Sequence, residues 1–368
     1  MMSMKPRTKH ILSIALAAAV IAMLLYLDSN KAQYSYSIAI LERSAIYAVV
    51  AVSMNLLTGF TGLFSLGQAG FMAIGAYTVG ILTIPVEARP NVYYINGIAE
   101  PLANVNLPFW AALILGGLMA ALVGGLIGIP VLRLKSDYLA IATLGFSEII
   151  RALIAAPQLD RITNGSYGLK SIPAFSSILQ VFGIAALCIL IMILVINSSY
   201  GRAFKAIRED ETAAEAMGIN LFKHKSMSFV ISCFFTGISG GLLAVFMRSI
   251  DSKTFQVNLT YDILLIVVLG GLGSITGSVL ASFLMTAGRE WLRFFDVPLV
   301  IGGFSVPLFR NGFRMVIFSL ILMAVVLYYR KGLMGNKEFS WDGILRFFYR
   351  IAGRLRRKTP GNGGEANA

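Results

Sequence analysis

The chain has 368 residues, of which 57% are hydrophobic and 13% charged, and its formal net charge is +13. A soluble protein of this length carries about a quarter charged residues, so the composition excludes an ordinary soluble domain and indicates an integral membrane protein. The positive charges lie between and after the apolar runs and form no separate domain, which argues for a role in membrane orientation and against nucleic-acid binding.

A helix that crosses the bilayer core of about 30 Å needs about 20 predominantly apolar residues. We therefore predict an all-α, polytopic helical bundle of about ten transmembrane helices. The range is eight to ten, because glycine-rich segments can be broken or re-entrant where protein surrounds them. The predicted spans are residues 11–27, 38–57, 63–84, 109–132, 138–156, 178–196, 227–247, 261–287, 291–309 and 313–329.

Lysine and arginine in short loops stay on the cytoplasmic side of a membrane, so their distribution predicts the orientation. They gather in the N-terminal segment, after residue 132, in the loop 198–226 and after residue 329, whereas the loops 85–108 and 157–177 contain few. We therefore predict that both termini are cytoplasmic and that the number of crossings is even. The first span follows a basic start, as in a signal peptide, but no small-x-small cleavage site follows it, so we expect it to be retained.

Two domains are predicted: a transmembrane domain, residues 1–335, and a basic tail, residues 336–368. In the segment 339–357, aromatic and aliphatic residues alternate at helical spacing with Arg346, Arg350 and Arg354. This pattern predicts an amphipathic helix on the membrane surface, in contact with anionic lipid, and the alternative is a disordered basic tail. The end of the tail, after Thr359, is predicted to be disordered.

Two segments, 56–76 and 267–282, interleave glycine and serine with apolar residues and form a weak internal repeat. Many transporters build a site between such repeats, where glycine leaves the backbone exposed. The alternative is close helix packing through small residues. The sequence leaves both interpretations open.

The charged loop 198–225 has the sequence SSYGRAFKAIREDETAAEAMGINLFKHK. Its alanine, glutamate, lysine and arginine residues favour a helix, and Gly218 with Asn220 supplies a stop signal. We predict a short cytoplasmic helix whose small and acidic residues dock into a cleft on a soluble partner. The alternative is a solvated connector.

The stretch GRAFKAIREDETAAEAMGIN in this loop resembles the coupling loop of the LivM-type branched-chain amino acid ABC permeases. Three other stretches resemble the same family in the same order: SLGQAGFMAIGAYTVGIL (65–82), SDYLAIATLGFSEIIRALI (136–154) and VVLGGLGSITGSVLAS (267–282). The resemblance covers residues 41–333. The chain departs from the general ABC permease pattern at Thr212, where glutamate is usual, and from the family in TNGSYGL (163–169) and YYRKGL (328–333).

This resemblance implies a type II-like ABC importer permease of the bacterial inner membrane that forms half of a pathway for Leu, Ile or Val. The implied partners are a LivH-type second permease in a heterodimer, two ATP-binding subunits, a periplasmic substrate-binding protein and membrane lipid. The expected ATPase-coupling residues are Arg202, Arg208, Glu209, Asp210, Glu211, Ala213, Ala214, Glu215, Met217 and Gly218. The expected pathway residues are Gly62, Ser65, Gly67, Gln68, Gly70, Gly270, Gly271, Gly273, Ser274 and Gly277.

The sequence contains no phosphate-binding loop of the GxxxxGK[ST] type and no pattern of metal-ligating or acid–base residues. We therefore expect a non-catalytic subunit with no catalytic residue, cofactor or metal. Cys188 and Cys233 fall inside apolar stretches, so we expect two buried thiols and no disulfide.

The sequence leaves two rival functions open. An ion-coupled secondary transporter would need acidic residues deep in several spans, whereas only Glu148 clearly qualifies. Arg151 follows Glu148 at a spacing that predicts an ion pair. The other rival is an ABC permease for other amino acids, amides or urea.

Overall fold

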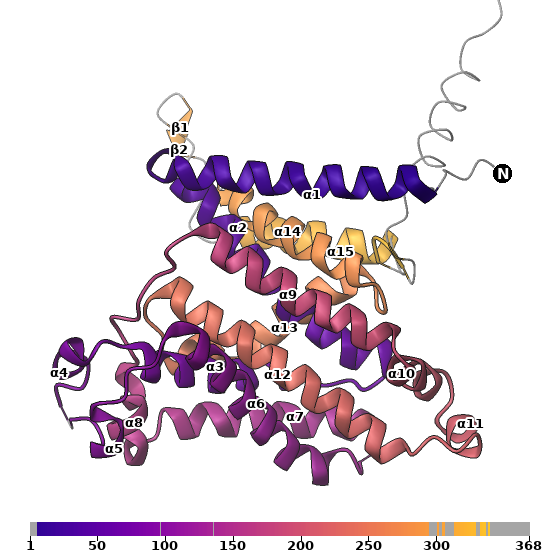
Figure 1. Cartoon of the computed structure of the whole chain (residues 1–368), viewed down its shortest axis with the longest axis horizontal. Helices are drawn as coiled ribbons and strands as arrows, with labels where there is room; N and C mark the ends of the chain where they lie inside the picture. The colour runs from indigo at the N-terminus through magenta and orange to yellow at the C-terminus, as the bar shows by residue number, and fades with distance from the viewer. Residues whose placement is uncertain are drawn as a thin grey trace, which may run out of the picture.

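In a computed structural model of the chain, the structure describes residues 6–95, 97–134, 136–293, 300–301, 304–305, 313–328, 332–335 and 338. The predicted tail helix 339–357 and the tail end lie outside these residues. The regular structure of the described part is helical apart from one two-residue β pair and an isolated β-bridge (Figure 1).

The first half of the chain begins with two long helices, α1 (Pro6–Ser29) and α2 (Lys31–Asn55), and α2 ends in a π-helical turn, Leu56–Phe60. An extended segment leads to α3 (Gln68–Thr83). The short helices α4 (Arg89–Val92) and α5 (Glu100–Ala103) precede α6 (Phe109–Val131), and α7 (Ser136–Ile154) is followed by the short α8 (Asp160–Thr163).

The second half begins with α9 (Ile178–Asn197), which leads into two short helices, α10 (Ser199–Glu209) and α11 (Glu211–Ala216). The long α12 (Leu221–Met247) comes next, followed by α13 (Val257–Gly270) and α14 (Ile275–Trp291). The strands β1 (Val300–Ile301) and β2 (Phe304–Ser305) pair antiparallel, with Val300 opposite Ser305, before α15 (Phe313–Tyr328).

Among the described residues, five helices are long and apolar enough to cross a membrane: α1, α2 with its π-helical turn, α6, α9 and α12. The number rises to seven if each of two bent pairs counts as one span: α3 with the helical turns up to Val92, bent by 100°, and α7 with the turns up to Thr163, bent by 57°. These helices confirm the prediction of a helical integral membrane protein.

Helix α12 is the centre of the bundle and packs against α2, α3 and α6. Glycines allow the closest of these contacts: a Cβ added at Gly75 of α3 would lie 2.0 Å from the carbonyl oxygen of Gly237 in α12, and one at Gly240 would lie 2.0 Å from that of Met72. Helices in lipid associate mainly through such close backbone approach, because burying apolar surface brings no gain there.

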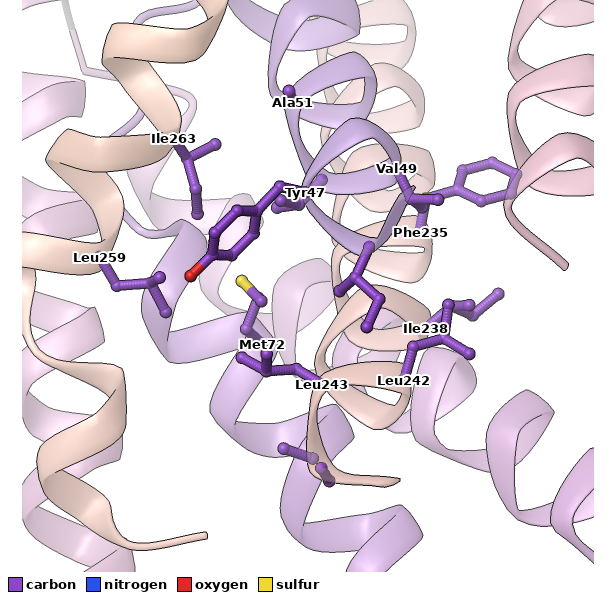
Figure 2. Packing of buried hydrophobic residues seen from close by; sticks show 14 of the residues in the cluster. Tyr47, Val49, Ala51, Met72, Phe235, Ile238, Leu242, Leu243, Leu259 and Ile263 are labelled. Atoms are coloured by element: carbon purple, nitrogen blue, oxygen red, sulfur yellow. The ribbon is translucent and has the colours of Figure 1, made fainter. Parts of the chain in front are cut away.

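Large side chains fill the spaces on either side of this crossing. Figure 2 shows the ring of Tyr47 in α2 pointing toward Leu259 and Ile263 of α13, with Met72 of α3 beside it. Apolar residues of α12 pack on the other side of α2. Cys188 and Cys233 are free thiols in buried positions, as predicted.

The single span predicted over 261–287 is wrong, because this segment contains the end of one helix and most of another. Asp262 of α13 pairs with Arg289 of α14, and nearer the turn a Cβ at Gly270 would touch the backbone of Gly277. Both contacts join residues at similar distances before and after the break at 271–274. Helices α13 and α14 therefore form an antiparallel helical hairpin. The apolar content of the segment fits one span or a hairpin equally well.

The helix predicted over 291–309 is also wrong where the structure describes it, because Val300, Ile301, Phe304 and Ser305 form the β pair. Most of that range lies outside the described residues. The remaining predicted spans coincide with helices, although 63–84 begins with the extended segment and becomes helical only at Gln68.

Helix α1 lies along the outside of the bundle (Figure 1). Of its side chains from Ile11 onward, only Leu24 and Leu27 are buried. Its main polar attachment is Asp28, whose Oδ1 accepts hydrogen bonds of 3.1 Å from the Ser177 hydroxyl and the backbone N–H of Ile178, at the start of α9.

The loop 85–108 is organised by Arg89, a buried side chain that donates to the carbonyl oxygens of Ile84, Ala103 and two further residues. This guanidinium therefore holds the loop together through backbone carbonyls. The nearby Tyr93 is buried as well, and burial raises the pKa of its phenol to about 12.

The close approach of α3 and α12 predicts the effect of one added methyl group. Gly75→Ala should destabilise the protein by about 2 kcal/mol or more, because backbone of α12 must move to admit the new Cβ. The matched control is Gly145→Ala in α7, where an added Cβ meets nothing within 4 Å. Thermal unfolding of the purified protein in detergent measures both, and equal melting temperatures would contradict the packing described here.

Candidate coupling and translocation site

Two interruptions of the helices, residues 61–67 and 271–274, lie side by side in the bundle. A Cβ added at Gly59, in the π-helical turn before the first break, would lie 2.5 Å from the backbone nitrogen of Gly273 in the second. Gly62, Gly271 and Gly273 have φ values of +78°, +115° and +88°, which side chains rarely allow. The two halves of the weak sequence repeat therefore meet in space.

Threonines from other helices satisfy the backbone at the first break. Thr143 of α7 accepts a hydrogen bond of 3.0 Å from the N–H of Leu66, and Thr260 of α13 accepts one of 3.1 Å from the N–H of Ala69. Non-helical backbone is tolerated inside a membrane protein only where such partners replace water. These contacts fix the first break against α7 and α13.

The side chain of Asn55, at the end of α2, binds the second break. Its Oδ1 accepts a hydrogen bond of 2.9 Å from the N–H of Gly273, and its Nδ2 lies 2.9 Å from the carbonyl oxygen of Ser274 and 2.8 Å from the Ser278 hydroxyl. Asn55 has no exposed surface. Both ends of its amide are therefore used to hold the turn of the α13–α14 hairpin.

The first turn of α14 is capped by two side chains. Ser274 accepts a hydrogen bond of 3.1 Å from the N–H of Gly277. The carboxylate of Glu338 accepts bonds of 2.7 Å and 3.0 Å from the N–H groups of Ile275 and Thr276, and its negative charge suits the positive end of a helix dipole. The segment 332–335 lies against the same turn, where the N–H of Leu333 donates to the carbonyl oxygen of Leu269.

The polar residues expected to line a pathway point into the interior of the bundle. Gln68 accepts a 2.6 Å hydrogen bond from Thr236 of α12, and Thr236 also contacts Ser53 of α2 at 2.8 Å. Ser65 and Ser274 have no exposed surface. These hydroxyls and the amide therefore contribute to internal packing.

The glycines expected in the pathway divide into two groups. Gly67, Gly70, Gly270 and Gly277 each face a neighbouring helix so closely that an added Cβ would come within about 3 Å of it. They fit the packing alternative. Gly62 is exposed, as are the neighbouring side chains of Phe64 and Leu272, so the surface of the two breaks is mainly apolar.

The predicted coupling loop forms two helices where one was expected. The chain leaves α10 at Asp210, whose extended backbone breaks the helix and whose carboxylate accepts a 3.0 Å hydrogen bond from the N–H of Ala213 at the start of α11. Gly218 is left-handed after α11, and Asn220 caps α12. Asp210 is therefore both an exposed charge and a cap, a role that the composition of the loop did not reveal.

The outer surface of the loop is acidic around one large apolar side chain. Met217 is 83% exposed, and the acidic residues Glu209, Asp210, Glu211 and Glu215 are exposed around it. Ala213 and Gly218 are exposed as well, whereas Ala214 is buried. Lys225 of α12 holds Glu211 in a 2.6 Å ion pair, which ties α11 to the bundle.

The two predicted coupling arginines point in different directions. Arg202 is exposed and lies 2.9 Å from the Ser199 hydroxyl of its own helix. Arg208 points inward and donates a hydrogen bond to the carbonyl oxygen of Gly59. A Cβ at Gly62 would lie 3.2 Å from Arg208 Cα, and one at Gly273 would lie 2.8 Å from its Nη1. Arg208 therefore contacts both breaks from the coupling loop.

A cavity of about 420 Å³ lies beside this junction and is lined by side chains that include Phe60, Lys205, Arg208, Thr276 and Glu338. The ammonium of Lys205 lies 5.6 Å from the centre of the Phe60 ring. Charged groups of both signs thus surround the place where α10 meets the breaks.

Glu148 and Arg151 form the predicted ion pair, with Arg151 Nη2 2.6 Å from Glu148 Oε2 on the same helix. A single helix over 261–287 does not bring Asp262 and Arg289 together, so the sequence does not predict this second ion pair. Sequence reasoning also misses Asn55, although an asparagine at the end of an apolar span, directly before a glycine-rich segment, is an available signal. Within the described residues, no group of three His, Cys, Asp or Glu side chains could hold a metal ion.

Comparison with known proteins gives the family. Residues 36–326 match the family described as "Branched-chain amino acid transport system / permease component". The chain belongs to this family. Such permeases are non-catalytic membrane subunits, and the membership agrees with the resemblance seen in the sequence.

Three relatives illustrate the similarity. The high-affinity branched-chain amino acid transport system permease protein LivM of Escherichia coli is 35% identical over 71% of this chain and 65% of its own length. A probable LivM permease of Methanocaldococcus jannaschii is 26% identical over 84% of this chain and 96% of its own, and a probable LivH permease of the same organism is 23% identical over 83% and 94%. The chain thus spans just under two thirds of the E. coli relative. No solved structure matches it.

The role of Asn55 predicts a large effect of its removal. Asn55→Leu should destabilise the protein by about 3 kcal/mol, because the N–H of Gly273 and the carbonyl of Ser274 lose a buried partner. Asn91→Leu, at an exposed asparagine of α4, is the matched control and should change little. Thermal unfolding in detergent distinguishes them, and a wild-type melting temperature for Asn55→Leu would refute the role.

Proposed function

We propose that this chain is the transmembrane permease subunit of an ATP-driven ABC importer for Leu, Ile and Val in the bacterial cytoplasmic membrane. The observation that carries the proposal is Arg208, which connects the exposed coupling loop with both helix breaks. A loop that only joined two spans would not need a part-buried charged contact to them. The names of the relatives at 34% and 35% identity support the substrate class.

The proposed assembly contains four further subunits. Two ATP-binding subunits would dock on the α10–α11 loop, and a periplasmic substrate-binding protein would deliver the amino acid. A LivH-type permease would form the other half of the pathway, and the 23% identity with a LivH permease supports a heterodimer of two related chains. The exposed apolar surface of the breaks, at Phe64 and Leu272, is the part of this chain that we assign to the pathway.

The proposed topology has ten crossings: α1, α2, α3, α6, α7, α9, α12, α13, α14 and α15. The α13–α14 hairpin supplies two of them. With an even number of crossings, both termini and the basic loops after residue 132 and at 198–226 lie on the cytoplasmic side, which satisfies the positive-inside rule.

The proposed mechanism is a difference in contact between two states of the ATPase subunits. Their closure on ATP would bind Met217 and the surrounding carboxylates differently in each state, and only such a difference can shift the access of the pathway. A displacement of α10 would act through Arg208 on the backbone of Gly59 and Gly273. Asn55 would couple the end of α2 to this movement, because it bonds Gly273 and Ser274 in the second break.

Substitution of Arg208 tests this proposal. In cells that carry all the subunits, Arg208→Met should lower import of labelled leucine about tenfold, the size of a typical coupling free energy, while the ATPase subunits still copurify. Arg133→Met, which removes an arginine from another basic loop, is the control and should import normally. Normal import by Arg208→Met would refute the coupling role, and copurification of no ATPase would refute the importer assignment.

Labelling of a cysteine placed in the loop tests the orientation. Glu211→Cys, on exposed α11, should react with a membrane-impermeant maleimide only after the membrane has been opened. Tyr94→Cys, at an exposed position in the loop 85–108, should react in spheroplasts with an intact membrane. Neither native thiol interferes, because Cys188 and Cys233 are buried. The reverse pattern would contradict the topology. It would place the loop on the periplasmic side, where the ATP-binding subunits could not dock on it.

A further inference from the structure

A second cavity, of about 120 Å³, lies between α2, α13, α14 and α15. It is at the end of the α13–α14 hairpin away from the turn, so it lies at the opposite end from the coupling loop. Its polar lining comprises Arg43, Asp262, Thr286, Arg289 and Glu290. Ionisable side chains inside a membrane protein are costly, and a group of four around one cavity is a functional-site hypothesis by default.

One ion pair forms a wall of this cavity. Arg289 Nη1 donates a 2.8 Å hydrogen bond to Asp262 Oδ2, and Nη2 bonds the other carboxylate oxygen. The guanidinium lies over the ring of Phe318, with Cζ 5.1 Å from the ring centre. This fork leaves Nε of Arg289 buried without a hydrogen-bond partner. Arg289 therefore keeps one donor unused although its charge is balanced.

The hydroxyl of Thr286 is also unused. Thr286 is 5% exposed, and its Oγ1 has no hydrogen-bond partner. By contrast, the buried Thr83 donates a 2.7 Å bond to the carbonyl oxygen of Val79 in its own helix. Buried hydroxyls are nearly always bonded, so an unbonded hydroxyl on a cavity wall is a signal for a ligand.

Arg43 supplies a charge that the described residues do not balance. Its guanidinium lies 5.4 Å from the ring centre of Tyr47 and contacts the Tyr47 hydroxyl at 3.3 Å. None of the ion pairs formed among the described residues includes it. On the same cavity, the carboxylate of Glu290 accepts a 2.9 Å hydrogen bond from the Tyr36 hydroxyl. The remainder of the wall is apolar and includes Ile266 and Met285.

We propose that this cavity binds the charged head of a zwitterion that carries an apolar group. The anionic part of the ligand would accept hydrogen bonds from Arg43, Thr286 and Nε of Arg289, and its ammonium would face Glu290. Charge-assisted bonds of this kind are the strong ones in a medium of low dielectric constant. The apolar group would lie along Ile266, Met285 and Phe318.

The cavity has a volume of about 120 Å³, which is room for the small charged head of a ligand. Two sources provide this chemistry: a free apolar amino acid such as leucine, and an ethanolamine phospholipid of the membrane. The proposal does not depend on the coupling mechanism, because none of its residues belongs to the α10–α11 loop or to the breaks.

Equilibrium binding to the full chain, purified in detergent with whichever subunits copurify, tests the proposal. Tritiated leucine is titrated in the absence of any binding protein, and native mass spectrometry of the same samples measures retained phosphatidylethanolamine. The test variants are Arg43→Gln and Thr286→Val. Arg161→Gln, at an exposed arginine of α8, and Thr83→Val are the matched controls.

One of the two ligands should bind about tenfold more weakly to each test variant and normally to the controls, the loss expected for one charge-assisted hydrogen bond. An effect on leucine identifies the amino acid as the ligand, and an effect on phosphatidylethanolamine identifies the lipid. Without ligand, Thr286→Val should melt no lower than the wild type, since it removes only an unbonded hydroxyl. Unchanged binding of both ligands to both test variants, or no binding to the wild type, would overturn the proposal.

Discussion

The structure depends on one constraint, that every backbone polar group inside a membrane must find a partner within the protein. Regular helices meet it by themselves, and the two breaks do not. Asn55 meets it for the second break, because its amide has a donor end and an acceptor end, and Thr143 and Thr260 meet it at the first. The breaks lie side by side as one structural unit, with Arg208 in contact with both, although about 200 residues of chain separate them.

This unit explains why the coupling loop and the glycine-rich segments occur in the same chain. Glycine at 62, 271 and 273 lets the backbone adopt conformations that other residues resist, and the absence of side chains leaves room for the Arg208 guanidinium. The loop on the surface and the non-helical backbone inside are therefore in direct contact. The cavity around Arg43 lies at the other end of the hairpin, so a ligand there and a partner at the loop would act on the same two helices.

The sequence predicts the positions of most spans well, because the thickness of a bilayer fixes the length of an apolar run. It does not predict the direction of the chain at 271–274, since a run of this composition serves equally as one helix or as a hairpin. The contacts that decide the matter, from Asn55 and Glu338, come from residues far away in the chain. For the same reason Gln68 looked available to a substrate, although Thr236 of α12 already bonds it. The loop was recognised through its resemblance, and its division into two helices depends on a single cap at Asp210.

Helix α1 is more exposed than the other long helices of the bundle. It precedes the region matched by the family, buries two side chains beyond residue 10, and is fastened mainly through Asp28 at its far end. Most of its surface is therefore left for acyl chains or a neighbouring subunit. Its 24 residues extend about 36 Å as a helix, somewhat more than the hydrocarbon thickness, and tilting accommodates such a mismatch. Where α1 faces acyl chains, one aliphatic side chain can replace another at little cost in packing, and the length of the apolar run is the property that its sequence must keep.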